Sequence, residues 1–222
     1  MHLDKHLNPA KLQALAEHIQ AAKDDLLQGV TFDRNELTLV SRPNNIEDLL
    51  TFLRDDKTCQ FKMLISVCGA DYPEREDERF DVVYHLLSLT QNQRIRVKVP
   101  VAEGESVPSV CEIFSSANWY ERETYDMFGI RFENHPDLRR LLTDYDFDGF
   151  PLRKDFPVEG RVEMFYDEEQ RRCVYRPTNL KQDFRHFEWS SPWEGVGHAT
   201  HLAEEDNLNA YDAKDFTAEG QK

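Results

Sequence analysis

An acidic segment over residues 144–155 comes nearest to a recognisable ligand-binding pattern. It contains alternating aspartates, a glycine directly after them and a further aspartate at the twelfth position: Asp144, Asp146, Asp148, Gly149 and Asp155. Carboxylates at alternating positions before a turn glycine are what the twelve-residue calcium loop of an EF-hand requires. The pattern raises the hypothesis of a stand-alone calcium-regulated binding protein.

Three features of the same segment weigh against a bound calcium ion. Asp155 is one methylene shorter than the bidentate glutamate that usually stands at the twelfth position. Arg153 and Lys154 place positive charges beside the expected ion, and Pro157 prevents a helix from following directly. We therefore favour an acidic turn, and calcium binding stays as a distant alternative.

A second charged segment, residues 121–129, lies where a predicted helix ends. Glu121 and Glu123 are two residues apart, so on a helix their side chains point about 200° apart and cannot act as an acid and base pair. Arg122 and Asp126 are four apart and are expected to form an ion pair on the helix surface. No serine or cysteine has a convincing base nearby, and no phosphate-binding glycine loop occurs, so we expect no catalytic residue on this chain.

The cysteines and histidines do not indicate a metal or cluster site. The four cysteines are scattered without any C-x-x-C pair: Cys59, Cys68, Cys111 and Cys173. Zinc and iron–sulfur sites draw their thiolates from short repeated spacings. His198 and His201 are three residues apart in an acidic segment without apolar neighbours, which favours a solvated tail over a ligand pair. We expect neither a metal nor a cofactor on this chain.

Charge and hydrophobicity exclude several classes of partner. The chain has 27 Lys and Arg against 42 Asp and Glu, a net charge of −15. Nucleic acids and anionic lipids both require clustered cations, so neither is an expected partner. No run approaches the roughly 18 apolar residues of a membrane-spanning helix. Residues 1–6 lack the pattern of a signal peptide, so we expect a cytosolic chain with no direct membrane insertion.

Two helices are predicted in the first part of the chain. Apolar residues at three-and-four spacing predict a helix over residues 8–28, with Asn8 as its N-cap, Pro9 in its first turn and Gly29 as its C-cap. Asn45 is then expected to cap a short second helix, whose apolar residues are Ile46, Leu49, Leu50 and Leu53.

Strands are predicted on both sides of that short helix. Residues 30–32 and 36–40 alternate about a polar turn and predict a β-hairpin. Residues 61–68 are almost continuously apolar, as expected for a central strand, and residues 80–89 are similar. Residues 94–99 alternate basic and β-branched side chains, which indicates a strand with one wet face.

These elements together predict an α+β domain over residues 1–129. The turn at residues 90–93 is too short for a parallel crossover, so the strands that flank it are expected to pair antiparallel. A third helix is predicted to begin near residues 106–108 and to end at Gly129. We expect a mostly antiparallel sheet with the helices packed on one face, followed by a long extended C-terminal tail.

The chain changes character over residues 130–197. Prolines interrupt it repeatedly, and twelve aromatic side chains lie between Phe132 and Trp193 with no helical or strand period except one hairpin, residues 162–166 with 172–175. So much apolar area without a core of its own is typical of a segment that folds against another protein. Residues 198–222 are expected to be an acidic disordered end.

Two blocks of this sequence resemble, closely, the thirty-kilodalton subunit family of respiratory complex I, the proton-pumping NADH:quinone oxidoreductase. The first block supplies the acids, bases and apolar pair of the family signature: Glu121-Arg122-Glu123, Asp126, Met127-Phe128, His135 and Arg139. The second is the run over residues 151–157, and the closing Trp193-Glu194-Gly195 is also familiar. The family commonly has Gly where Asp146 stands and His where Phe150 stands.

The resemblance implies a hydrophilic peripheral-arm subunit without a cofactor of its own. In such a complex, electrons pass from NADH through FMN and iron–sulfur clusters, carried by partner subunits, to quinone. The C-terminal extension would lie on the forty-nine-kilodalton subunit of complex I, next to cluster-bearing neighbours, in a structural and assembly role. The complex would stand at the cytoplasmic face of the bacterial inner membrane.

The resemblance also implies a set of interface residues within the two blocks. The expected subunit-interface residues are Glu121, Arg122, Glu123, Asp126, His135, Arg139, Arg140, Arg153, Lys154 and Asp155. Of these, the arginines are expected to pair with carboxylates across a subunit boundary, because the guanidinium fork fixes orientation. A membrane-bound hydrogenase or a ferredoxin-driven relative uses a similar subunit and remains the alternative.

Overall fold

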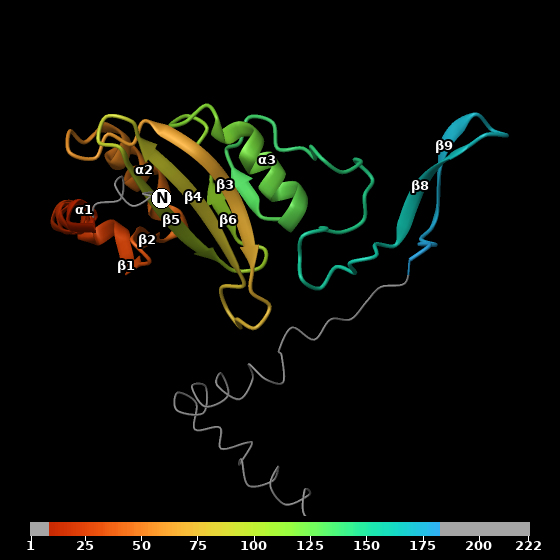
Figure 1. Ribbon diagram of the computed structural model, residues 1–222, viewed down its shortest axis with the longest axis horizontal. Helices are drawn as coiled ribbons and strands as arrows, with labels where there is room; N and C mark the ends of the chain where they lie inside the picture. Colours follow the sequence, from red (N-terminus) through yellow and green to blue (C-terminus); the bar gives the residue numbers. More distant parts are fainter. Residues whose placement is uncertain (1–8, 183–222) are drawn as a thin grey trace, which may run out of the picture. The chain divides into compact units, whose positions relative to one another are not determined.

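The computed structural model describes residues 9–182, and Figure 1 shows their arrangement. The elements, in chain order, are α1 (Pro9–Lys23), the 3-10 turn η1 (Asp24–Leu26), β1 (Leu27–Asp33), β2 (Glu36–Ser41), the 3-10 turn η2 (Pro43–Asn45), α2 (Ile46–Asp55), β3 (Met63–Asp71), β4 (Phe80–Ser88), β5 (Gln93–Val101), β6 (Ser106–Pro108), α3 (Ala117–Phe128), β7 (Arg131–Glu133), β8 (Val162–Asp167) and β9 (Arg172–Pro177). Of the described residues, those from 9 to 177 belong to one compact unit.

The main sheet has five strands in the order β1-β2-β5-β4-β3. Its neighbouring strands are antiparallel except for β2 and β5, which are parallel. The prediction of an α+β fold with a mostly antiparallel sheet is confirmed. The predicted hairpin is the β1–β2 pair, where Arg34 and Asn35 both have positive φ, as a tight two-residue turn requires.

The core lies on the face of the sheet that the helices cover. On β4, Val82, Tyr84 and Leu86 are fully buried on this face, and α2 adds three buried leucines to the same core: Leu49, Leu50 and Leu53. Burying each leucine contributes about 1.5–3 kcal/mol. Gly69 pairs with Val82, and a Cβ at Gly69 would stand 2.6 Å from the Phe128 ring, so α3 packs on this face too.

The opposite face of the sheet carries charged side chains along β5. Arg94 is exposed, and Arg96 and Lys98 are half-buried, which confirms the predicted wet face of β5. Arg96 donates to Thr38 on β2 and approaches His85 on β4 at 3.4 Å. Burial, and after it the Arg96 charge, lowers the pKa of His85.

The prediction that residues 61–68 form a central strand is wrong. Strand β3 begins at Met63 and is an edge strand, which pairs only with β4 in the described part of the chain. Its apolar side chains are covered by a helix rather than by a further strand, because α3 runs beside it and Phe128 fills the space above Gly69. A run of apolar residues predicts that a strand is buried, but it does not predict whether a neighbouring strand or a helix covers it.

The predicted end of the first helix is also wrong. Helix α1 stops at Lys23, and Gly29 lies inside β1 rather than at a helix C-cap. Gly29 pairs with Val40 next to an irregularity in the β1–β2 ladder. Residues 27–29, which were predicted to end the helix, therefore belong to strand β1. Asn8, the predicted N-cap, lies outside the described residues.

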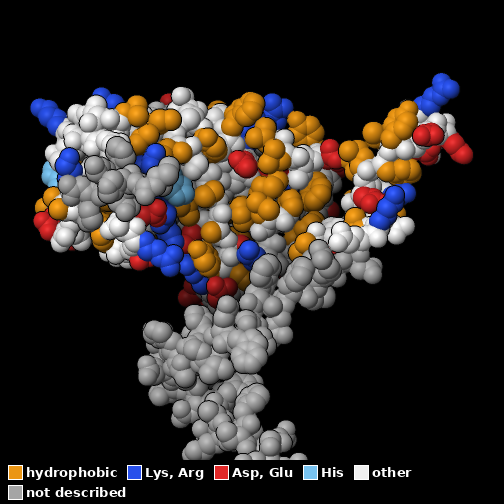
Figure 2. Space-filling model, in the orientation of Figure 1, with side chains coloured by type: hydrophobic (Ala, Val, Ile, Leu, Met, Phe, Trp, Pro, Cys, Tyr) orange, Lys and Arg blue, Asp and Glu red, His pale blue; other side chains and the backbone are white. Residues whose placement is uncertain are grey.

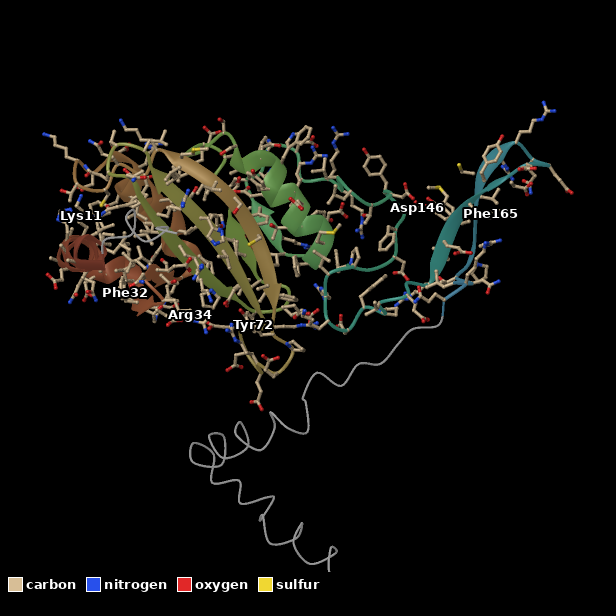
Figure 3. The ribbon with its side chains drawn as sticks, in the orientation of Figure 1. Lys11, Phe32, Arg34, Tyr72, Asp146 and Phe165 are labelled. Atoms are coloured by element: carbon tan, nitrogen blue, oxygen red, sulfur yellow. The ribbon has the colours of Figure 1, made fainter. Side chains whose placement is uncertain are left out.

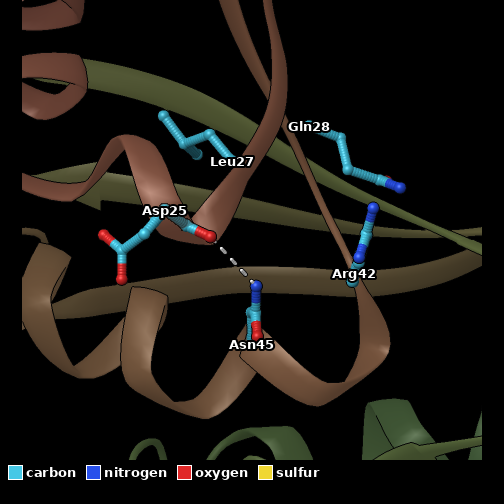
Figure 4. Close-up of a pocket in the computed structure, with 5 residues that line it drawn as sticks. All are labelled: Asp25, Leu27, Gln28, Arg42 and Asn45. Atoms are coloured by element: carbon cyan, nitrogen blue, oxygen red, sulfur yellow. Dashed lines mark hydrogen bonds between the residues drawn. The ribbon is translucent and has the colours of Figure 1, made fainter.

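Asn45 stands at the N-cap position of α2 but does not cap it. Its side-chain amide points to the carbonyl oxygen of Asp25, 3.5 Å away, across a pocket lined by Asp25, Leu27, Gln28, Arg42 and Asn45 (Figure 4). The 3-10 turn η2 precedes α2 directly, and the carbonyl of Pro43 accepts from the amide of Ile46. Because this turn extends the helix backwards, the side chain of Asn45 is released for another partner.

The third helix is shorter than predicted. Residues 106–108 are not its start: they form β6, which pairs in parallel with β7. Helix α3 begins at Ala117, after a series of turns. Its end is as predicted, since Gly129 adopts the left-handed conformation with φ of 79° and its amide donates to Tyr125 O.

The second predicted hairpin is confirmed as the β8–β9 pair. The expected domain boundaries at residues 129 and 197 stay predictions, and residues 183–222, with the expected acidic end, lie outside the described residues. Within residues 9–182, no helix combines the length and the hydrophobicity that crossing a membrane requires.

Candidate functional site

Glu121 is the most buried acid of the family signature. Its side chain is 0% exposed, and it accepts hydrogen bonds from Ser109 Oγ at 2.7 Å and from the Val110 amide at 2.8 Å. Burial raises the pKa of Glu121, although these hydrogen bonds oppose the rise. Glu123, two residues on, is exposed, so the two glutamates point in different directions, as the helical spacing requires. Glu121 therefore fastens the turn before α3 to the helix.

His135, in the segment that follows α3 in sequence, lies in the same buried cluster as Glu121. One ring nitrogen, Nε2, is 3.0 Å from the carbonyl oxygen of Asn118, and the other, Nδ1, accepts from the Asp137 amide at 3.0 Å. The proton therefore sits on Nε2, where it donates to Asn118. Cys111, Glu121 and His135 have ligand atoms within 4.8 Å of one another. Because both ring nitrogens and both Glu121 oxygens already have hydrogen-bond partners, this geometry favours a structural cluster over a metal site.

Asp126 anchors the chain that follows α3. Its carboxylate is fully buried and accepts from the amides of Leu141, Leu142 and Thr143, at 2.9, 2.6 and 2.9 Å. It also accepts from the Thr143 hydroxyl and from the Arg140 guanidinium, at 2.9 Å for the latter. Removal from water acts to raise the pKa of Asp126, but these hydrogen bonds outweigh it and lower the pKa to about 2. We call Asp126, Arg140 and residues 141–143 the Asp126 anchor.

The predicted helix-surface ion pair between Arg122 and Asp126 is not formed. Arg122 instead donates to the carbonyl oxygens of Arg139 at 3.2 Å and Arg140 at 3.4 Å. Asp126 takes Arg140, fourteen residues away, as its charge partner. The spacing of Arg122 and Asp126 on the helix would allow an ion pair. However, residues 140–143 offer Asp126 several hydrogen-bond donors at once.

A second set of contacts fastens residues 150–155 to the end of the sheet. Arg79 makes a two-pronged contact with Asp71, at 2.7 and 3.0 Å, and also donates to Asp155 at 2.9 Å. The Lys154 amide donates to Asp71 at 2.7 Å. The Arg79 hydrogen bonds are the main reason why the pKa of Asp71 is lowered. We call Asp71, Arg79, Asp155 and the Lys154 amide the Asp71 anchor.

Arg153 belongs to the same junction. Its guanidinium carbon lies 5.0 Å from the centre of the Phe80 ring and 4.6 Å from that of Phe150. Its Nε donates to Phe128 O at 2.6 Å, and its Nη1 pairs with Glu103 at 2.6 Å. Arg153 therefore caps the C-terminus of α3 while it joins that helix to the sheet.

The structure brings most of the ten expected interface residues into contacts within this chain. Glu121, Asp126, Arg122 and His135 are buried around α3, while Arg140, Arg153 and Asp155 hold the following segment. Glu123, Arg139 and Lys154 present exposed side chains, and the Arg139 side chain donates to Asp137 and Tyr145, both close to it in sequence. Sequence reasoning missed Asp71, Arg79 and Glu103, which no local pattern connects to residues 153–155.

The acidic segment does not gather its carboxylates around one point. Asp144 accepts from the Tyr175 hydroxyl, Asp148 pairs with Arg161 at 2.6 Å, and Asp155 belongs to the Asp71 anchor. Asp146 lies in the segment before β8 (Figure 3), with an exposed side chain. Three of the four aspartates therefore contact separate partners and the fourth is exposed, which does not support the calcium loop.

The β8–β9 hairpin has two different faces. One carries side chains from three cross-strand pairs: Val162 with Pro177, Met164 with Tyr175, and Tyr166 with Cys173. The side chains on this face are apolar or aromatic apart from the thiol, and Met164 is 61% and Tyr175 56% exposed. We call these six residues the apolar hairpin face. Figure 2 shows hydrophobic side chains on the surface of this part of the molecule.

The other face of the hairpin is satisfied within itself. Arg176 pairs with Glu163 at 2.6 Å and lies 4.2 Å from the centre of the Phe165 ring, which Figure 3 labels. Phe165 and Val174 are half-buried. The two faces of the hairpin therefore differ, since the polar and aromatic side chains of one contact each other while those of the apolar hairpin face are mostly exposed.

Comparison with known proteins finds relatives over most of the chain. The model of a family described as respiratory-chain NADH dehydrogenase, 30 Kd subunit, matches residues 39–162. The chain is 58% identical over 185 residues to an NADH-quinone oxidoreductase subunit of Xanthobacter autotrophicus, covering 83% of this chain and 88% of that protein. The corresponding protein of Sinorhizobium medicae is 57% identical, with 83% and 92% covered. A solved trypsin-resistant fragment (1-134) of Nqo5 is 33% identical, with a TM-score of 0.49, covering 58% of this chain and 99% of that one.

Proposed function

The chain belongs to the family of the 30-kDa subunit of respiratory-chain NADH dehydrogenase, and from this membership we propose that it is a cofactor-free structural and assembly subunit in the peripheral arm of its complex. As a member of this family, it is part of an NADH:quinone oxidoreductase and works together with other subunits. Under the proposal, partner subunits carry the FMN and the iron–sulfur clusters that pass electrons to quinone. The forty-nine-kilodalton subunit is the proposed main partner, on the cytoplasmic face of the inner membrane.

The apolar hairpin face is the observation that carries this proposal. Val162, Met164, Tyr166 and Tyr175 are each more than half exposed, at 54, 61, 58 and 56%. Aromatic side chains and methionine are enriched in the cores of protein interfaces. Exposing them costs free energy that a partner surface recovers, at about 25 cal/mol for each Å² buried. We therefore propose that this face lies on the forty-nine-kilodalton subunit.

The two anchors support the same proposal by fixing where the hairpin begins. The Asp126 anchor holds residues 140–143, and the Asp71 anchor holds residues 154 and 155. A segment that is already held loses less conformational entropy when it binds. The buried charges of this chain therefore orient a surface whose own contacts are apolar.

Three of the expected interface residues remain available for contacts across a subunit boundary. Glu123, Arg139 and Lys154 are exposed, and we propose them as interface residues. The seven others have partners inside the chain, so in this proposal they act on the interface by fixing the backbone beside it.

Variants of the hairpin test the assembly role. Met164→Asp places a charge in the centre of the apolar hairpin face, and burial of an unpaired charge at an interface is costly. We expect membranes from cells with this variant to lose most of the intact complex in native gels, and most of the NADH:quinone activity. Glu168→Lys, in the exposed hairpin turn, is the matched control and should leave both unchanged. An unchanged complex with Met164→Asp would refute the role.

Cys173 offers a second measurement without any substitution. It lies on the apolar hairpin face and is exposed. We expect a maleimide to label Cys173 in the isolated full-length chain and to label it far more slowly in the purified complex.

The proteins that co-purify with the chain identify the enzyme complex to which it belongs. An NADH-oxidising flavoprotein among them fits the proposal, and a hydrogenase in its place contradicts it.

A further inference from the structure

Helix α3 presents an aromatic ring and a carboxylate side by side on its outer face. Trp119 is 67% exposed, and Glu123, four residues later, is also exposed. Residues four apart on a helix are neighbours on its surface. Within residues 9–182, neither side chain forms a hydrogen bond, an ion pair or a ring contact. Tryptophan is rarely left so exposed without a partner, because it carries a large apolar area.

The strand next to α3 extends this surface. Ser116, at the start of the helix, lies 3.5 Å from the carbonyl oxygen of Leu64 on β3, and Phe128, at its end, packs over Gly69. Cys68 on β3 is exposed and lies near enough to Glu123 for the carboxylate to help raise the pKa of the thiol, although partial burial of the sulfur is the larger cause. We call Trp119, Glu123 and Cys68 the α3–β3 surface.

The chemistry of this surface selects a cation. A guanidinium or ammonium group is attracted to the face of an indole ring, and a carboxylate beside the ring adds a charged hydrogen bond. The long apolar stem of arginine or lysine packs well on an apolar surface such as the indole of Trp119. The net charge of −15 further favours the approach of a basic partner.

We propose that the α3–β3 surface binds an arginine- or lysine-bearing segment of another subunit, with the cationic group over Trp119 and paired with Glu123. The inference rests on the proposed function, because it takes the partner from the same assembly. It adds a second contact, separate in sequence and in chemistry from the apolar hairpin face. Arginine fits best, since its planar group can stack on the indole and pair with the carboxylate at once.

Titration of the purified full-length chain onto partner subunits, taken from cells that lack this chain, tests the inference. Trp119→Ala is expected to weaken binding by about thirtyfold, the effect of losing one interface hot spot. Glu123→Lys is expected to weaken it more than Glu123→Gln, because the lysine repels the bound cation. Glu17→Lys, on the exposed face of α1, is the matched charge-reversal control and should bind as the unchanged chain does.

Salt dependence distinguishes a cation site from simple loss of apolar contact. Binding by the unchanged chain should weaken as salt is added, and Glu123→Gln should reduce this dependence. Trp119→Phe, which keeps a ring, should retain more affinity than Trp119→Ala. In the complex, Cys68 should be protected from a maleimide. Thermal midpoints of all variants should equal that of the unchanged chain, because the replaced side chains are exposed.

The outcomes separate this inference from the proposed function. If Trp119→Ala and Glu123→Lys bind normally while Met164→Asp weakens binding, the α3–β3 surface is not an interface and the assembly role stands. If all of them bind normally, both proposals fail. If Trp119→Ala weakens binding but Glu123→Lys and added salt do not, the partner is not cationic and the inference is overturned.

Discussion

The segment after α3 and the β8–β9 hairpin use their side chains in opposite ways. In the Asp126 and Asp71 anchors, the two aspartates that give the anchors their names are buried and each is paired with an arginine of the same chain. On the hairpin, apolar and aromatic groups are exposed. A buried charge without a partner is costly, so the anchors must be complete within the folded chain. An exposed apolar face is tolerated only until a partner covers it. The anchors, whose charges have partners within the chain, therefore differ from the apolar hairpin face, whose side chains are not covered by the described part of the chain.

Replacing Asp126 by alanine is the strongest way to break the first region. It removes the acceptor of three backbone amides and leaves Arg140, 15% exposed, without its carboxylate. We expect a loss of about 3–5 kcal/mol in the free energy of unfolding, measured by urea denaturation of the full-length chain. Asp146→Ala, at an exposed position, should change it by less than about 0.5 kcal/mol. Equal effects of the two variants would mean that the anchor does not stabilise the fold.

Acid should weaken the same anchor in a defined pH range. The pKa of Asp126 is lowered to about 2 in the folded chain, against about 3.9 for an unfolded aspartate. The unfolded state therefore binds the proton first, and the stabilisation is complete above about pH 5 and is lost as the pH falls through about 2. We expect about 2–3 kcal/mol from this group, seen as a urea midpoint that falls between pH 5 and 2. Asp126→Asn should flatten that fall, and an unchanged slope would contradict the assignment.

Burial of Glu121 should act with the opposite sign. Its pKa is raised, so the folded chain keeps its proton longer than the unfolded chain. The contribution is complete below the unfolded pKa and is lost as the pH rises through the folded pKa. Comparing Glu121→Gln with Asp126→Asn therefore separates the two slopes in one experiment.

Two glycines offer a matched test of the junction between α3 and the Asp71 anchor. Gly129 has φ of 79°, and a Cβ there would stand 2.6 Å from the Phe150 ring and 2.7 Å from Arg153. Gly104 has φ of 87° with nothing within 4 Å. Gly104→Ala should cost about 1 kcal/mol from backbone strain alone, and Gly129→Ala about 2–3 kcal/mol because crowding is added. Equal losses in urea denaturation would show that the junction can relax.

The smallest expected effect lies on the hairpin. Met164→Ser removes apolar area that is already exposed in this chain, so the unfolding free energy of the isolated full-length chain should change by less than about 0.5 kcal/mol. The same urea measurement gives the answer. A loss above about 1 kcal/mol would show that the apolar hairpin face is covered within the chain itself, and the contrast between the two regions would disappear.

Local features of the fold were accessible from the sequence where a short pattern decides the structure. The first hairpin followed from alternation on both sides of a short polar turn, and the helix end at Gly129 followed from the ease with which glycine adopts positive φ. The β4–β5 pairing followed from a turn too short for any other connection. The errors arose where a neighbour overrode a local preference: Gly29 was taken into a strand, Asn45 turned to Asp25, and β3 was covered by a helix.

The sequence by itself determined the α+β class and the family, because the strand and helix periods and the signature residues are local patterns. Only the tertiary structure decided which charges are partners, because Asp71 and Lys154 are 83 residues apart and Arg79 and Asp155 are 76 apart. Such pairs form only after the sheet and α3 have brought distant parts of the chain together. A carboxylate accepts a hydrogen bond from whichever donor the fold places within about 3 Å of it. Spacing along a helix therefore could not predict that Asp126 pairs with Arg140 rather than with Arg122.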